Sequence, residues 1–185
     1  MNTRIQNAQD DYRARIQALH RELGIPADYE TRFHLSLRTE ADQLTGIGED
    51  IHGRSQQLAP RAAEHWRAMQ ARAQDDQVAL LVVSAFRSVD YQRDLMTRKL
   101  TAGRPIEEIL KVNAAPGYSE HHTGCALDLA AAGYAPLETN FETTDAFAWL
   151  MEHANRFGFR LSFPRDNRHG IVYEPWHWAY LKDQP

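Results

Sequence analysis

Residues 78–88 read VALLVVSAFRS, a continuous apolar run rich in β-branched residues that ends in a short polar segment. Such a run is typical of a strand buried on both faces. Because Ser88 is a good N-cap residue, we expect a helix over residues 89–102, which Gly103 ends. The strand therefore delivers Arg87 to the point where a helix begins.

Upstream of this run, residues 5–23 carry apolar side chains at the spacing of an amphipathic helix, and Gly24 follows. Residues 27–54 show no regular pattern and contain several glycines, which favours loops or short strands. A second helix is expected to begin at Ser55 or Pro60 and to end near residue 74.

Downstream, the pattern predicts a short helix and a loop, then a strand, a long helix and two late strands. Their expected ranges are 104–118, 125–130, 144–157, 159–163 and 171–180. Helices and strands mix without regular βαβ alternation. This order favours an α+β fold with a small, largely antiparallel central sheet flanked by helices.

The length of 185 residues suits one domain with its own hydrophobic core. We therefore expect a single domain over residues 1–185, with a helical and irregular part over 1–77 and a part bearing the functional motifs over 78–181. With 43% hydrophobic and 25% charged residues, the composition is that of a globular protein.

The charge pattern argues against nucleic acid as a partner, because the formal net charge is -4 and the Lys and Arg residues are scattered. No segment has the roughly 18 apolar residues of a membrane span, and the N-terminal residues lack the apolar core of a secretory signal. We therefore expect no membrane association and a cytoplasmic location. The only cysteine, Cys125, excludes an intrachain disulfide and is expected to be a packed, unreactive thiol.

Two short segments carry residues that suit a metal site. Residues 119–128, SEHHTGCALD, place two histidines and an aspartate close together, and Glu174 and His177 follow near the C-terminus. Imidazole nitrogens and carboxylate oxygens suit zinc. Three protein ligands leave a position for water, whose proton a nearby carboxylate such as Glu174 can take.

Strand geometry does not decide whether His121 or His122 is the ligand that accompanies Asp128. Residues six apart share a strand face, so His122 would accompany Asp128, whereas His121 would do so only if the chain turns at Gly124. For the same reason Glu174 and His177 can address one metal only if the strand begins after Pro175. We therefore expect Glu174 on a loop and His177 in a strand.

These segments resemble those of the VanY-type D-alanyl-D-alanine carboxypeptidases, zinc peptidases related to VanX and to hedgehog-like domains. The family pattern of Ser, His, Gly, Ala and Asp is matched by Ser119, His121, Gly124, Ala126 and Asp128. The resemblance covers roughly residues 78–181. It implies the hedgehog- and VanX-like fold, a Zn²⁺ cofactor, and His121 rather than His122 as a ligand beside Asp128.

Two further motifs of the family occur in the expected order. Glu174 and His177 match a Glu and His pair, which implies that His177 completes the metal site and Glu174 is the catalytic base. Arg87, at the end of its strand, is matched together with Gln92. By this resemblance Arg87 polarises the scissile carbonyl or stabilises the oxyanion, and Gln92 and Ser119 hold the peptide terminus.

The function implied is a zinc metallopeptidase that releases C-terminal D-alanine from peptidoglycan stem peptides or muropeptides. A cytoplasmic location favours L,D cleavage of recycled tetrapeptides. The alternatives are a D,D-carboxypeptidase or D,D-dipeptidase that acts on precursors, an endopeptidase that cuts L-alanyl-D-glutamate bonds, and a zinc-stabilised binding module without turnover.

Overall fold

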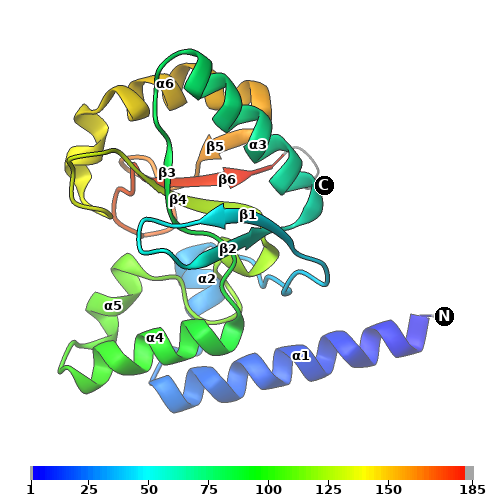
Figure 1. Ribbon diagram of the computed structural model, residues 1–185. Coiled ribbons are helices and arrows are strands. Elements are labelled where there is room, and N and C mark those ends of the chain that lie inside the picture. Colours follow the sequence, from blue (N-terminus) through cyan, green and yellow to red (C-terminus); the bar gives the residue numbers. More distant parts are fainter. Residues whose placement is uncertain (1, 182–185) are drawn as a thin grey trace.

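The computed structural model describes residues 2–181, in which helices and strands are mixed along the chain (Figure 1). The α-helices are α1 (Asn2–Leu23), α2 (Tyr29–Phe33), α3 (Pro60–Asp75), α4 (Val89–Thr101), α5 (Ile106–Val112) and α6 (Asp145–His153). Three short 3₁₀ helices are η1 (Glu120–Thr123), η2 (Thr139–Thr143) and η3 (Ala154–Phe157). The strands are β1 (Thr45–Glu49), β2 (Ser55–Leu58), β3 (Leu81–Ser84), β4 (Ala126–Ala130), β5 (Phe159–Leu161) and β6 (His177–Tyr180).

The strands form two antiparallel sheets. β1 and β2 make a hairpin, while the central sheet has the order β3-β4-β6-β5. The strand that comes last in the described chain, β6, thus lies between β4 and β5. The expected α+β fold with a small antiparallel sheet is confirmed.

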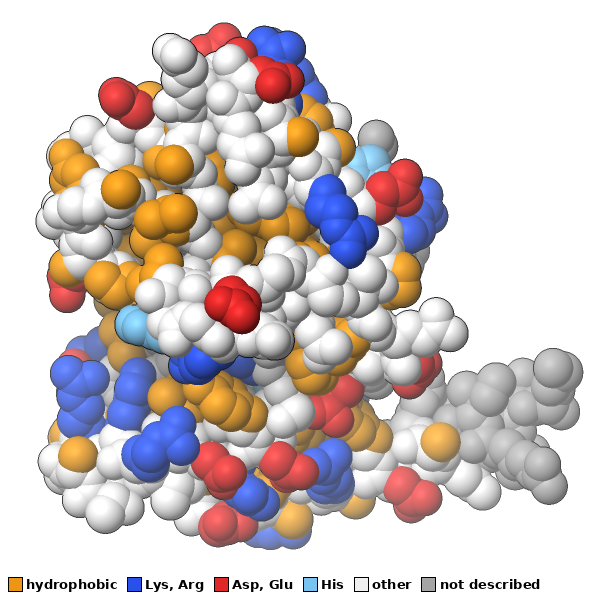
Figure 2. Space-filling view, viewed as in Figure 1, with side chains coloured by type: hydrophobic (Ala, Val, Ile, Leu, Met, Phe, Trp, Pro, Cys, Tyr) orange, Lys and Arg blue, Asp and Glu red, His pale blue; other side chains and the backbone are white. Residues whose placement is uncertain are grey.

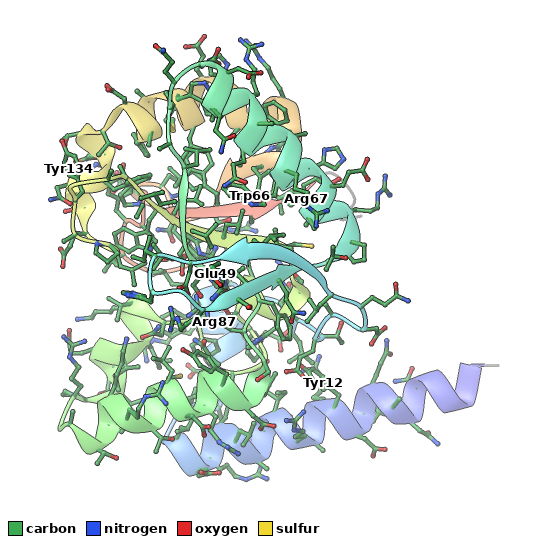
Figure 3. All side chains as sticks on the ribbon, in the orientation of Figure 1. Tyr12, Glu49, Trp66, Arg67, Arg87 and Tyr134 are labelled. Carbon is green, nitrogen blue, oxygen red and sulfur yellow. The ribbon has the colours of Figure 1, made fainter. Side chains whose placement is uncertain are left out.

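In Figure 1, α3 and α6 lie on one side of the central sheet and pack against it, whereas α1, α4 and α5 form a separate layer below the sheet and the β1–β2 hairpin. Trp66 of α3 is fully buried against the sheet and belongs to a first core cluster with Leu127 of β4 and Trp178 of β6 (Figure 3). A second cluster joins α1, α2, α4 and α5 and includes Ile16 and Met96. None of the described helices is long and apolar enough to cross a bilayer.

The first 77 residues contribute to both clusters. Ile16 and Leu23 of α1, together with Tyr29 of α2, pack in the second cluster, whereas Trp66 and Met69 of α3 pack in the first. Elements upstream of the motif-bearing part therefore belong to both hydrophobic clusters of the protein. That the chain forms one domain stays a prediction.

Three expected elements differ from the structure. Residues 55–58 form β2 rather than a helical start. The strand expected from residue 78 begins only at Leu81, because the Val78 amide donates to Ala73 near the end of α3. This strand, β3, lies at the edge of the central sheet. The strand expected over 171–180 covers only β6, since the Val172 amide donates to Lys111 outside the sheet.

Candidate metal centre

The turn before β4 fixes the position of His121. Ser119 is the N-cap of η1, and its Oγ accepts a hydrogen bond of 3.3 Å from the His121 amide. Gly124 ends η1 with a φ of +66°, which L side chains rarely adopt. A Cβ at Gly124 would lie 2.7 Å from the backbone nitrogen of Ala59, so only glycine fits this close approach. The turn at Gly124 leaves His121 outside the strand, on η1.

The register of the sheet brings in the next two residues. Asp128 of β4 lies directly opposite His177 of β6. β6 begins at His177, and the His177 amide donates to the Glu174 carbonyl over 3.1 Å in the turn before the strand. Glu174 therefore lies on a loop beside the strand that carries His177.

His121, Asp128 and His177 converge on one buried position, with one ligand atom from each within 4.8 Å of the others. Nδ1 of His121 lies at hydrogen-bond distance from the Ala85 carbonyl, which can only accept, so Nδ1 carries the proton. Nε2 of His121 is then an unprotonated acceptor, buried without a hydrogen-bond partner and 3.3 Å from Asp128 Oδ2. Two acceptors that face each other in a buried site are complementary to a cation.

The His177 ring also has a defined orientation. Its Nδ1 lies 3.0 Å from Asp128 Oδ1, and its Nε2 lies 2.9 Å from Glu120 Oε2. Burial alone would lower the pKa of His177, but hydrogen bonds with Asp128 and Glu120 outweigh it and raise the pKa to about 10. Without a metal this ring is therefore protonated, and Nδ1 is the nitrogen that faces the other two ligands.

Burial and nearby charges keep the other two ligands, His121 and Asp128, in the protonation states that bind a metal ion. Burial, followed by repulsion from Arg87, lowers the pKa of His121 to about 4, so its ring is neutral. Burial opposes ionisation of Asp128, yet the histidines and Arg87 hold the pKa of its carboxyl well below the usual value. The donor set of two imidazoles and one carboxylate fits zinc.

Glu120 is a functional residue that the sequence reasoning missed. Besides its bond to His177, it forms an ion pair of 3.9 Å with Arg38. A carboxylate that binds the outer nitrogen of a metal-ligating histidine fixes the ring orientation and raises its basicity. Its only sequence signal is its place beside His121, because the contact with His177 spans 57 positions.

His122, left open by strand spacing, lies outside the metal cluster. Its side chain is fully buried, and Nδ1 lies 2.6 Å from the Arg87 carbonyl. Nε2 accepts a hydrogen bond of 3.1 Å from the Gly117 amide. Because backbone groups occupy both ring nitrogens, His122 ties two loops together and offers no free ligand atom.

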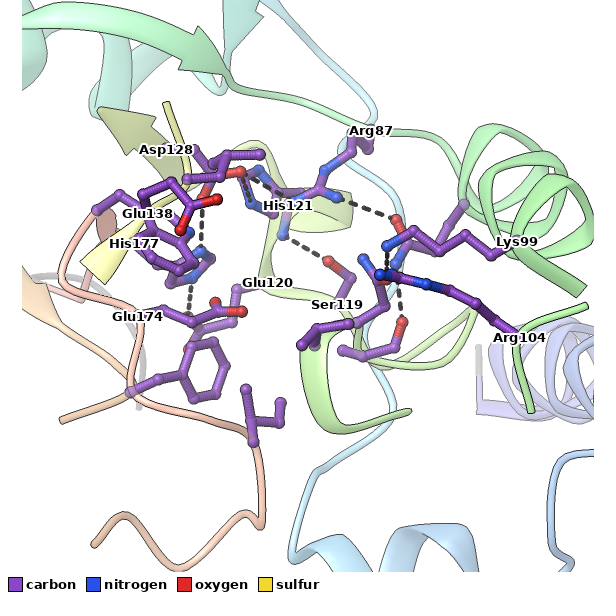
Figure 4. A pocket seen from close by; sticks show the side chains of 18 residues that line it. Arg87, Lys99, Arg104, Ser119, Glu120, His121, Asp128, Glu138, Glu174 and His177 are labelled. Carbon is purple, nitrogen blue, oxygen red and sulfur yellow. Dashed lines mark hydrogen bonds and ion pairs between the residues drawn. The ribbon is translucent and has the colours of Figure 1, made fainter. Parts of the chain in front are cut away.

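Arg87 reaches the metal cluster from the loop between β3 and α4 (Figure 4). One guanidinium nitrogen lies 3.2 Å from Asp128 Oδ2, and another donates to Gln92 Oε1 over 3.4 Å. Gln92 in turn donates to the Ala114 carbonyl over 2.8 Å. Gln92 therefore orients Arg87, and its expected contact with the peptide terminus stays a prediction.

A cavity of about 370 Å³ opens in front of these residues (Figure 4). Arg87, Ser119 and Glu174 line it together with the three ligands, and Trp176 forms part of the wall. Ser119 Oγ accepts from a backbone amide, which leaves its proton free for a ligand. All residues expected to act in the site thus meet at one cavity.

Glu174 has the electrostatics of a base. Its side chain is 8% exposed, and burial is the main reason that its pKa rises to about 7. Asp128 raises this pKa further, whereas His177 and Arg87 lower it. A carboxylate with a pKa near neutrality can both take and return a proton during hydrolysis.

Comparisons with known proteins show which family the chain is similar to. The family model described as VanY, D-alanyl-D-alanine carboxypeptidase, matches residues 55–183. A D-alanyl-D-alanine carboxypeptidase from Enterococcus faecalis (strain ATCC 700802 / V583) is 30% identical over 173 residues, which cover 88% of this chain and 57% of that protein. The chain thus spans little more than half the length of this relative.

Two solved structures share the fold. The LdcB LD-carboxypeptidase matches with a TM-score of 0.68 and 26% identity, over 77% of this chain and 70% of that one. VanYB in complex with D-alanine-D-alanine matches with a TM-score of 0.59 and 28% identity, over 75% of this chain and 76% of that one. With the family model matched over most of its length, the chain belongs to the VanY D-alanyl-D-alanine carboxypeptidase family.

Proposed function

We propose that this protein is a zinc-dependent carboxypeptidase that releases C-terminal D-alanine from peptidoglycan stem peptides. The observation that carries the proposal is the meeting of His121, Asp128 and His177 with Glu174 and Arg87 at one cavity. Three ligands on one side of a cavity, with a base and a fixed cation beside them, suit hydrolysis of a peptide bond. The relatives named for this activity support the substrate class.

A zinc ion held by the three ligands would polarise the scissile carbonyl and make a coordinated water more acidic. Glu174 removes a proton from the attacking water as the new C–O bond forms. When the C–N bond breaks, Glu174 returns that proton to the leaving amine of D-alanine. Arg87 donates to the carbonyl oxygen, where negative charge develops in the transition state.

For the bond that is cut, we propose L,D cleavage of tetrapeptides. The LD-carboxypeptidase has a higher TM-score than VanYB, 0.68 against 0.59, and its structure was described in connection with peptidoglycan recognition. The test is incubation of the zinc-loaded protein with defined tripeptide, tetrapeptide and pentapeptide stems, read by mass. Free D-alanine from the tetrapeptide supports L,D cleavage, whereas release from the pentapeptide alone supports D,D cleavage.

Other products would contradict the proposal. Hydrolysis of free D-alanyl-D-alanine, added as a fourth substrate, to two D-alanine molecules without release from any stem indicates a dipeptidase, and cleavage after L-alanine indicates an endopeptidase. A protein that binds zinc but cleaves none of these peptides is a binding module. Each outcome is visible in the same mass spectra.

The role of Glu174 is tested by substitution. Glu174→Ala should retain zinc and lose at least about a hundredfold in kcat, because general base catalysis contributes this much. Glu138→Ala is the matched control, since Glu138 lines the same cavity but is not among the three clustered ligands. Hydrolysis that survives in Glu174→Ala would remove Glu174 from the mechanism.

A further inference from the structure

The wall of the cavity opposite the metal ligands is cationic. Lys99 of α4 and Arg104, in the turn after α4, point into the cavity in Figure 4 and line it together with His121 and His177. Lys and Arg side chains also gather over α4 and α5 on the face shown in Figure 2. The mechanism above uses neither Lys99 nor Arg104.

Neither cation forms an ion pair in the described part of the chain, although the charge of Glu174 attracts Lys99 at longer range. Within residues 2–181, no carboxylate lies at ion-pair distance from Lys99 or Arg104. Lys99 Nζ donates instead to the side-chain oxygen of Asn113, which is neutral. Burial, followed by repulsion from Arg104 and Arg87, lowers the pKa of Lys99. The positive charges of Lys99 and Arg104 therefore lie close enough to repel each other.

The acidic side chains that line the cavity, Glu120, Asp128, Glu138 and Glu174, lie at its metal end in Figure 4. Asp128 contacts both metal-ligating histidines and Arg87, and Glu120 is bonded to His177. Glu174 lies beside the ligands and has its pKa raised to about 7. The negative charge of the cavity is therefore concentrated at the metal end, and the positive charge of Lys99 and Arg104 at the other.

Neighbouring cations on the same helices behave differently. Lys111 of α5 forms an ion pair of 2.6 Å with Glu108, and Arg98 of α4 lies over an aromatic ring at 5.9 Å. Both are satisfied on the surface and neither lines the cavity. The unpaired charge of this region is thus directed into the space that a substrate would fill.

We propose that Lys99 and Arg104 form an anion subsite that binds a carboxylate of the substrate, apart from the metal ligands and Arg87. The inference rests on the proposed function and adds a determinant of specificity to it. A peptide substrate can bring this carboxylate from its free C-terminus or from an acidic side chain of the residue before the released alanine. A half-buried lysine and an exposed arginine on one wall of the cavity are complementary to either group.

The test is a double-mutant cycle on peptide binding. Isothermal titration calorimetry measures Kd in a zinc-loaded Glu174→Ala background, so that no turnover is needed. Three peptides are compared: the free acid with an acidic penultimate side chain, the same peptide with an amidated C-terminus, and the same peptide with that side chain amidated. Each is titrated into the background protein and into the same protein carrying Lys99→Gln and Arg104→Gln.

Amidation of the carboxylate that occupies the subsite should weaken peptide binding about tenfold to a hundredfold, as for other charge-assisted contacts. This loss should disappear in the Lys99→Gln, Arg104→Gln protein, because the two changes remove the same interaction. Coupling with the C-terminal amide assigns the subsite to the terminal carboxylate, and coupling with the side-chain amide assigns it to the acidic side chain.

Arg98→Gln and Lys111→Gln provide matched controls, since they remove the same charges outside the cavity. Single Arg104→Gln, at an exposed position, guards against misfolding in the double variant. If neither amidation couples to Lys99 and Arg104, or if the controls show equal coupling, the subsite is wrong. Because binding is measured without turnover, this outcome differs from failure of the proposed function, in which the wild-type protein cleaves no stem peptide.

Discussion

At the scale of single residues, the protonation of His177 governs how the site takes up metal. The ring lies between two carboxylates, with Asp128 on Nδ1 and Glu120 on Nε2. The ring nitrogen that faces the other ligands carries a proton in the metal-free protein, because these carboxylates raise the pKa of His177 to about 10. A metal ion and a proton therefore compete for Nδ1.

This competition predicts that zinc affinity rises with pH. Between the pKa of Glu174, about 7, and that of His177, about 10, His177 is the ligand that must lose a proton. The apparent association constant should then increase about tenfold for each pH unit, because one proton leaves for each zinc ion bound. Competition titrations against a chelator of known affinity, corrected for the chelator's own protonation, measure this slope.

Glu120→Gln tests the cause of the slope. Loss of the carboxylate charge lowers the pKa of His177, so the rise in zinc affinity should level off at a lower pH than in the wild-type protein. A variant that follows the wild-type curve would show that Glu120 does not act on the His177 ring.

At the scale of structural elements, the turn between η1 and β4 holds the ligands in register. Gly124→Ala should destabilise the protein by about 1–2 kcal/mol from its left-handed backbone alone, and further from the contact of 2.7 Å with Ala59. Urea denaturation measures the loss. Zinc affinity should fall as well, because His121 lies three residues before this turn.

Gly103→Ala is the control for this prediction. Gly103 has a φ of +81°, but a Cβ there meets no atom within 4 Å. It therefore reports the backbone strain without the steric overlap. Equal losses of stability in the two variants would mean that the close approach to Ala59 contributes nothing.

Sequence periodicity predicted the elements whose signals are local. The helix from residue 89 follows from the Ser88 cap, whose Oγ accepts a 3.0 Å hydrogen bond from the Tyr91 amide. The strand at 171–176 was wrong because its backbone groups bond to distant segments, such as Lys111, which periodicity does not encode. Propensity describes the chain locally, whereas tertiary hydrogen bonds decide where a strand begins.

In the candidate site, too, local sequence signals could be read in advance, whereas contacts between distant segments could not. Spacing left His121 and His122 open, and the family pattern favoured His121. The structure distinguishes them by their partners, since backbone groups occupy both nitrogens of His122 while Nε2 of His121 faces Asp128. Glu120 could not be singled out, because its role depends on a contact made only in the folded protein.

At the scale of the whole molecule, the metal centre lies where the two core clusters meet. Phe163 and Ile171 of the second cluster and Trp176, packed on the first, all line the cavity of the metal ligands. A bound ion ties together η1, β4 and β6. Metal binding should therefore stabilise the entire fold.

Removal of zinc should lower the melting temperature of the protein. A ligand present at about 1,000 times its Kd contributes about 4 kcal/mol to the free energy of unfolding. Differential scanning calorimetry with and without a chelator measures the shift. His121→Ala, which lacks one ligand, should show little response to the chelator. An equal melting temperature for the zinc-loaded and metal-free wild type would contradict a metal that bridges these elements.

The order of strands in the central sheet also bears on how the protein is made. Among residues 2–181, β5 pairs only with β6, which follows it in the chain. β5 therefore has no sheet partner there until β6 has been synthesised and has inserted beside β4. The same insertion carries His177 to Asp128. During translation, the nascent chain therefore has an incomplete sheet until this strand emerges, and His121, Asp128 and His177 come together only once it has inserted.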